Sequence, residues 1–271
     1  MTYARHDPAD DFDTISRIPS WVTSARAETI EDVAFLSGAA LNHLHVVLRR
    51  EDLPQALLRD RLALRAAEAC VTFSGGAERA GELRDAVHLL RPGDLPGPAG
   101  EAYLSWRRAV ERPVSVKALA RALPILEPGQ IATWLDAGNG APVTRSAAVL
   151  EAVLTEEPRA EVSALVLADA ALAQELDWDH LVPLLAAGLK RADLRKRGED
   201  LSLACHRALA ASVIEAVRLA ADLARQAGHL KAVAPKLRAK GAGEAVEIFL
   251  TQDAVAPGAL PFAGPRRAAA L

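Results

Sequence analysis

Residues 199–230 read EDLSLACHRALAASVIEAVRLAADLARQAGHL, a stretch built mainly from alanine, leucine and charged side chains and free of proline. Alanine and leucine are strong helix formers, so the stretch predicts one long α-helix. Pro235 breaks the pattern on its C-terminal side, and a basic turn at 190–197 precedes it. The fold is therefore organised around a helix much longer than the average in globular proteins.

The rest of the chain has the same character. Of its 271 residues 51% are hydrophobic, mostly alanine and leucine, and only 4% are aromatic, which favours helices over strands. Thr29 and Ser115 are expected N-caps, and Pro128 is an expected first-turn proline. Asp177–Asp179 is expected to cap a helix through Leu189. We predict an all-α, multi-helix array of about eleven helices without strands.

The sequence also indicates a division of the chain. Small-residue helices at Ser37–Leu41 and Ala168–Leu172, each followed by a proline-containing restart, are compatible with two similar helical halves or with a likeness produced by the alanine- and leucine-rich composition alone. The predicted organisation is a flexible N-terminal segment at 1–25, an N-terminal half at 26–140, a C-terminal half at 141–256 with basic clusters, and a disordered tail at 257–271.

The cysteines and the N-terminus indicate where the protein resides. Cys70 and Cys205 lie inside apolar helical patterns without metal-ligand spacing, which is typical of core thiols in a reducing compartment. The stretch 1–19 is acidic and lacks the apolar segment of a secretory signal. No apolar run is long enough to span a bilayer. A cytoplasmic protein without membrane association is expected.

Charge is distributed unevenly. Residues 190–240 carry twelve Lys/Arg and five Asp/Glu, a net of +7, whereas the whole chain is −3 and the remainder is therefore −10. Basic surfaces of this kind attract nucleic acid or acidic proteins. The candidate anion-binding residues are Lys190, Arg191, Arg195, Lys196, Arg197, Lys236, Arg238 and Lys240.

The basic region divides into two clusters. Residues 190–197 and 231–240 are each +4, while 198–230 is −1. In a helix, Arg218 and Arg225 lie on one side, with Glu215 and Asp222 three residues before them as ion-pair partners. The middle is thus an ordinary solvated stripe, and the two clusters are roughly 50 Å apart along a straight helix.

A second concentration of polar residues precedes a Pro/Gly-rich loop expected at 91–100. Glu82, Asp85 and His88 recur at three-residue steps on one helix face, a pattern compatible with acid–base chemistry or with a solvated face. An aromatic residue next to arginines can stack on a base or bind phosphate. The candidate polar-site residues are Arg84, Asp85, His88, Arg91, Asp94, Trp106 and Arg107.

No residue pattern assigns a catalytic residue, metal ligand or cofactor. His43 and His45 are two positions apart, about 200° around a helix, so they cannot share an ion there. The chain lacks His-Glu-x-x-His, Gly-x-Ser-x-Gly and the phosphate-loop motif. Lys240–Glu244 carries two glycines and is read as a helix connection rather than an anion site.

Several motifs together carry a family resemblance. They are Phe35–Leu41 (FLSGAAL), Arg61–Val71, Glu82–Ala86, Arg91–Asp94, Gly97–Gly100, Trp106–Arg107, Arg191–Arg195 and Val233–Lys240. Across about 34–260 the chain resembles the bacterial family called domain of unknown function 1403, which implies no mechanism. Relatives usually continue past the position of Leu260 into a segment similar to the end of a winged helix, and we expect this chain to lack that segment.

A more distant likeness links Arg61–Arg108 to helical proteins related to the Fic class. The Fic signature needs His-Pro-Phe followed by Gly-Asn-Gly-Arg. Here Gly138–Gly140 has no such histidine and is followed by Ala141. The likeness therefore does not imply AMP transfer.

Three functions remain open from the sequence. The leading hypothesis is a regulatory or nucleic-acid-associated protein that touches phosphate through the two basic clusters. The second is a helical protein–protein interaction scaffold, whose charges are solvated or meet an acidic partner. The third is an enzyme with a site around Asp85, His88 and Arg91. We favour a non-enzymatic role.

Overall fold

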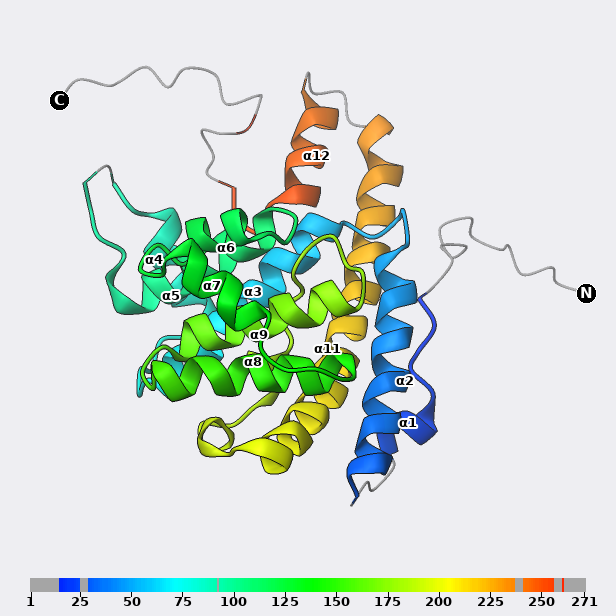
Figure 1. Ribbon diagram of the computed structural model, residues 1–271. Helices are drawn as coiled ribbons and strands as arrows, with labels where there is room; N and C mark the ends of the chain where they lie inside the picture. Colours follow the sequence, from blue (N-terminus) through cyan, green and yellow to red (C-terminus); the bar gives the residue numbers. More distant parts are fainter. Residues whose placement is uncertain (1–14, 25–28, 92, 237–240, 256–259, 261–271) are drawn as a thin grey trace, which may run out of the picture.

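The computed structural model describes residues 15–24, 29–91, 93–236, 241–255 and 260. Within these ranges the protein is an array of α-helices with no strand, which confirms the predicted all-α class (Figure 1). The predicted tail at 257–271 and the first part of the predicted N-terminal segment, 1–14, lie outside the described residues apart from position 260.

Helices follow one another with short connections. Two short 3-10 helices, at Asp193–Arg195 and Ala234–Lys236, flank the longest of them. The α-helices are α1 Ser20–Ser24, α2 Ile30–Leu48, α3 Gln55–Phe73, α4 Ala80–His88, α5 Gly97–Glu111, α6 Val116–Ala122, α7 Pro128–Leu135, α8 Pro142–Glu156, α9 Glu161–Glu175, α10 Leu185–Gly188, α11 Gly198–Val233 and α12 Ala242–Thr251.

The predicted long helix is α11. It has 36 residues, so it is about 54 Å long, and it runs along the whole molecule in Figure 1. Helices α2, α8 and α10 pack against it. Its buried positions recur every three to four residues, from Leu201 to Ala227, so one face of the helix lies in the core.

Local signals placed several helix boundaries correctly. The Thr29 hydroxyl accepts a hydrogen bond from the Asp32 backbone N–H at 3.2 Å, and the Ser115 hydroxyl accepts one from Ala118 at 3.2 Å. Pro128 occupies the first turn of α7. Each cap satisfies a backbone donor that the helix itself leaves unpaired.

The loop predicted at 91–100 was too long. Helix α5 begins at Gly97, and Pro98 stands in its first turn, where a missing N–H costs nothing. A Cβ on Gly100 would lie 2.7 Å from the Pro96 side chain, so glycine lets the connection approach the helix closely. The glycines and prolines that indicated a loop are in part the start of a helix.

The helix predicted from Asp177 to Leu189 was also wrong, because only α10 is helical in that range. The Asp169 carboxylate, buried within α9, accepts backbone hydrogen bonds from Leu184 at 3.0 Å and Leu185 at 3.2 Å. These bonds fix the start of α10. Before it the chain is not helical, and the Val114 N–H donates to the Asp179 carbonyl at 2.8 Å.

One apolar core contains residues from both predicted halves, and α9 lies almost wholly inside it, with every residue from Ser163 to Ala173 buried. Ile15, Ile18 and Val22 at the described N-terminal end belong to the same core. Ala227, Val246 and Leu250 form a small separate cluster between α11 and α12. The division at 140/141 stays a prediction.

Gly188 allows α10 to lie directly on α11. A Cβ at this position would stand 2.4 Å from the Ala208 carbonyl oxygen and 2.6 Å from the Ser212 hydroxyl. We expect Gly188→Ala to lower the free energy of unfolding by about 2 kcal/mol in urea denaturation, because backbone cannot yield. Gly129→Ala, with nothing within 4 Å, is the control and should change it by less than about 1 kcal/mol.

Asp169 should make stability depend on pH. Burial raises its pKa from 3.8 to about 7, although the two backbone hydrogen bonds oppose this. The folded state therefore holds a proton that the unfolded state has released, and Asp169 contributes less stability as pH rises from about 4 to about 7.

Urea denaturation at pH 5 and pH 8 checks this. Between pH 5 and pH 8 the free energy of unfolding of wild type should fall by about 2 kcal/mol more than that of Asp169→Asn, whose side chain does not titrate. Parallel pH profiles of the two proteins would show that Asp169 is ionised throughout.

Candidate functional site

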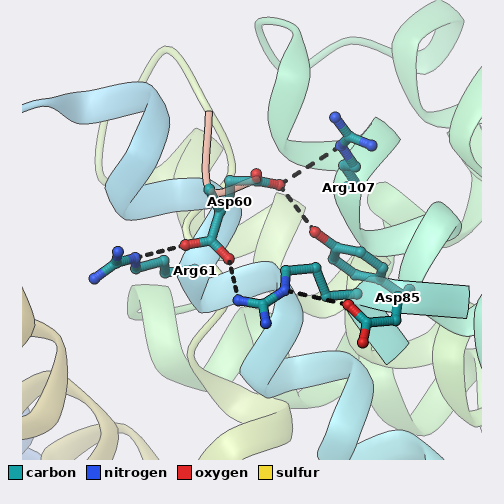
Figure 2. A network of polar contacts seen from close by, with 7 residues as sticks. Asp60, Arg61, Asp85 and Arg107 are labelled. Carbon is teal, nitrogen blue, oxygen red and sulfur yellow. Dashed lines mark hydrogen bonds and ion pairs between the residues drawn. The ribbon is translucent and has the colours of Figure 1, made fainter. Parts of the chain in front are cut away.

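A cluster of charged side chains lies where α3, α4 and α5 pack together (Figure 2). Helix α12 also packs on α3, which brings the chain after α12 to the same place. We name this group the arginine cluster. It consists of Asp60 and Arg61 on α3, Arg84, Asp85 and His88 on α4, Tyr103 and Arg107 on α5, and Asp253 after α12.

Helical periodicity places these side chains together. Arg84 and His88 are four residues apart on α4, and Tyr103 and Arg107 are four apart on α5, so each pair lies on one helix face. Leu83 and Trp106, next to these pairs, point into the core and are fully buried. Burial of the apolar neighbours therefore sets the direction of the polar pairs.

Asp60 is a largely buried carboxylate of the cluster, with its side chain 12% exposed. Its Oδ1 lies 3.5 Å from the Tyr103 hydroxyl and 3.7 Å from Arg107 Nε. Burial raises the pKa of Asp60, and the nearby Arg107 charge only partly opposes the shift. The neighbouring groups thus offset only part of the cost of burying the Asp60 charge.

Asp253 enters the cluster from far along the sequence. Arg61 Nε donates a hydrogen bond to its Oδ1 at 2.7 Å, and Arg84 Nη1 lies 3.9 Å from its Oδ2. The Asp253 side chain is only 6% exposed. It is the one carboxylate in the cluster that an arginine contacts at full hydrogen-bond distance.

His88 has a buried Nε2 atom with no hydrogen-bond partner among the described residues. Burial lowers the pKa of His88, the Arg107 charge lowers it further, and Asp60 opposes the shift. The ring is therefore neutral at pH 7.

Two of the guanidinium groups, those of Arg84 and Arg107, have no carboxylate of the cluster at hydrogen-bond distance. Arg84 Nε lies 3.8 Å from Asp85, and Arg107 Nε lies 3.7 Å from Asp60, both beyond hydrogen-bond distance. Arg61, Arg84 and Arg107 are 37–39% exposed. Solvent and partners can reach donors that the protein itself leaves free.

The structure brings together four of the predicted polar-site residues, Arg84, Asp85, His88 and Arg107. Trp106 instead points into the core, where its Nε1–H donates to Cys70 Sγ at 3.4 Å. It cannot stack on a nucleobase, because it is fully buried.

Arg91 and Asp94 also lie apart from the cluster. The Arg91 backbone N–H donates to the Asp94 carboxylate at 3.0 Å, which closes a turn in the loop between α4 and α5. Both side chains are exposed. Their role in the described structure is local.

Sequence reasoning missed four members of the cluster. Asp60, Arg61 and Tyr103 have a signal in the sequence, because polar residues interrupt the apolar pattern of α3 and α5. Asp253 has none, since nothing in its neighbourhood indicates a partner 192 positions earlier.

The two basic clusters lie at opposite ends of α11 (Figure 1). At the first end, Lys196 Nζ forms an ion pair with Asp193 at 2.7 Å, and the Arg197 guanidinium donates to the Leu194 and Lys196 carbonyls. Lys190, Arg191 and Arg195 are exposed.

Acidic side chains accompany this first cluster. Glu31, Glu199 and Asp200 line a surface pocket of about 580 Å³ together with Arg197. At the other end of α11 Lys236 is exposed, whereas Arg238 and Lys240 lie outside the described residues. A continuous basic groove does not form between the described parts of the two clusters.

The predicted solvated stripe on α11 is confirmed. Arg218 pairs with Glu215 at 2.5 Å and Arg225 with Asp222 at 2.7 Å, all four side chains being more than half exposed. Exposed pairs of this kind contribute less than about 1 kcal/mol each.

The two thiols and one buried histidine are held in the core. Burial raises the pKa of Cys70 and of Cys205 to about 12, which keeps both protonated. The Ser37 hydroxyl donates to the Ala34 carbonyl at 3.0 Å and lies 2.7 Å from His206 Nδ1. The hydrogen bond between Ser37 and His206 links α2 to α11.

His43 and His45 face different partners. His43 Nε2 lies 2.8 Å from the Ser16 carbonyl, while His45 Nδ1 accepts from Trp178 Nε1 at 3.0 Å. In the part of the chain that the structure covers, no three His, Cys, Asp or Glu side chains gather as metal ligands. Across the same residues, no helix has both the length and the apolarity to cross a bilayer.

The fold and the site define an all-helical protein with an arginine-rich charged cluster between three of its helices. The model of a family described as "Protein of unknown function (DUF1403)" matches residues 6–270, so the chain belongs to that family. This confirms the resemblance seen in the sequence, and the match extends beyond the motifs that carried it. The comparisons found no matching curated protein and no matching solved structure.

The pKa of His88 reports the charge balance of the cluster. It should lie below 6.5 in an NMR titration of the imidazole protons. Arg107→Met should raise it by removing a repelling charge, and Asp60→Asn should lower it by removing an attracting one. Equal His88 pKa values in all three proteins would show that burial alone sets the shift.

Proposed function

We propose that this protein is a helical interaction scaffold that binds an acidic segment of a partner protein at the arginine cluster. The observation that carries the proposal is the convergence of Arg61, Arg84 and Arg107, each more than one-third exposed. Only one contact among them and the cluster's carboxylates is as short as 2.7 Å.

The chemistry of the site suits a carboxylate. A guanidinium presents five N–H donors in a planar fork that matches the two oxygens of Asp or Glu. Arg84 and Arg107 keep donors free because their own carboxylates are 3.8 and 3.7 Å away. A partner carboxylate at either arginine would form the charge-assisted hydrogen bonds that are missing within the chain.

An apolar side chain next to the cluster adds a second type of contact. Leu89 follows His88 directly and is 75% exposed. Arginines beside exposed apolar residues are typical of protein–protein interfaces. The preferred partner segment therefore combines acidic residues with apolar ones.

An acidic protein segment is favoured over nucleic acid. The basic clusters are about 54 Å apart, and acidic residues and internal pairs reduce the charge of the first. An enzyme site is less favoured, because burial raises the pKa of Tyr103 well above its usual range and removes it as a proton donor.

Fluorescence anisotropy with a labelled short Asp/Glu/Leu peptide tests the proposal. Wild type should bind it and should not bind the peptide with Asn/Gln in place of Asp/Glu. Arg84→Ala and Arg107→Ala should each weaken binding roughly tenfold, as expected for lost charge-assisted hydrogen bonds. Arg108→Ala is the matched control on α5, since Arg108 is exposed and has no contact with the cluster among the described residues.

Labelled duplex DNA is the competing probe, measured at two salt concentrations. Steeply salt-dependent DNA binding that is lost on replacing Lys190, Arg191 and Arg195, together with no peptide binding, would overturn the proposal in favour of the basic clusters. Thermal unfolding of each variant shows whether the fold is retained.

A further inference from the structure

We infer that the C-terminal arm, α12 with Asp253, is an internal ligand of the arginine cluster, and that an acidic partner must displace it. The inference rests on the proposed function, since it names what occupies part of that site in the free protein. Asp253 lies between Arg61 at 2.7 Å and Arg84 at 3.9 Å, where a partner carboxylate would bind.

The Arg61–Asp253 ion pair is stronger than the other arginine–carboxylate pairs of the cluster. Among the arginine–carboxylate pairs of the cluster, Arg61–Asp253 is the shortest, and the Asp253 side chain is almost fully buried. A charge-assisted hydrogen bond shielded from water stabilises more than an exposed ion pair does. The arm thus meets the helices through this ion pair and through the Asp253 backbone N–H, which donates to the Asp60 carboxylate.

The apolar attachment of the arm is small. Val246 and Leu250 of α12 pack with Ala227 of α11 in a cluster separate from the main core. Phe249 on the same helix is 44% exposed. Few buried apolar contacts and a separate cluster are features of an element that opens without global unfolding.

Charge balance supports exchange of one carboxylate for another. Arg61, Arg84 and Arg107 face three carboxylates, those of Asp60, Asp85 and Asp253. Once the arm leaves, the remaining side chains carry one excess positive charge. A single Asp or Glu from a partner restores neutrality, as Asp253 does in the closed form.

Hydrogen exchange of the α12 amides tests the arm without requiring a partner. Asp253→Asn removes the charge and should raise their exchange rates roughly tenfold or more, while the amides of α9 stay unchanged. Glu247→Gln is the matched control, because it makes the same charge change on an exposed position of α12 and should have no effect.

A double-mutant cycle tests whether the Arg61–Asp253 contact is what slows exchange of the α12 amides. Arg61→Ala should accelerate exchange in α12 to a similar extent as Asp253→Asn, and the two together should do little more. Additive effects, or no acceleration in Asp253→Asn, would overturn the inference whatever the binding data show.

Binding of the acidic peptide separates the two proposals. Asp253→Asn should bind the peptide several-fold more tightly than wild type, because the competing carboxylate is gone. If wild type binds but Asp253→Asn binds equally well, competition by the arm is overturned and the proposed function stands. If exchange accelerates but neither protein binds, the proposed function fails and Asp253 is an intramolecular clamp only.

Discussion

A buried carboxylate in the middle of α9 fixes how the two sides of the molecule meet. Asp169 is nearly inaccessible to solvent and accepts the backbone hydrogen bonds that start α10. Taking a carboxyl group out of water is costly unless hydrogen bonds compensate it, and here two backbone donors offset part of that cost. These hydrogen bonds hold the segment after α9 against the core. They also place α10 on α11, where Gly188 allows the two helices to pack closely.

Small side chains make this arrangement dense. Helix α9 is buried on all sides and consists largely of alanine, leucine and valine. Such a helix presents no polar face between Ser163 and Ala173, so the clustered charges lie on other helices. The arginine cluster lies at the junction of α3, α4 and α5 for this reason, and it brings together charges that are only partly compensated. Membership of a family without a described activity leaves this cluster as the feature from which function is argued.

Local chemistry determined much of what the sequence predicted. The all-α class, α11 and the Thr29 and Ser115 caps follow from helix propensity and capping, which depend on neighbouring residues. The ion pairs of Arg218 and Arg225 follow from helical spacing in the same way. Half of the arginine cluster was predictable too, because residues four apart on α4 share a face whatever lies opposite.

Tertiary structure decided the rest. Leu181 and Leu184 are buried as their apolar pattern predicts, yet in a non-helical segment, because Asp169 and the Asp179–Val114 contact outweigh helix propensity there. Trp106 turned into the core and away from its arginine neighbour because burial of a large aromatic ring outweighs a surface contact. The pairing of Asp253 with Arg61 joins residues 192 positions apart. Sequence periodicity assigns a residue to a face of its own helix, whereas only packing determines which distant residue that face meets.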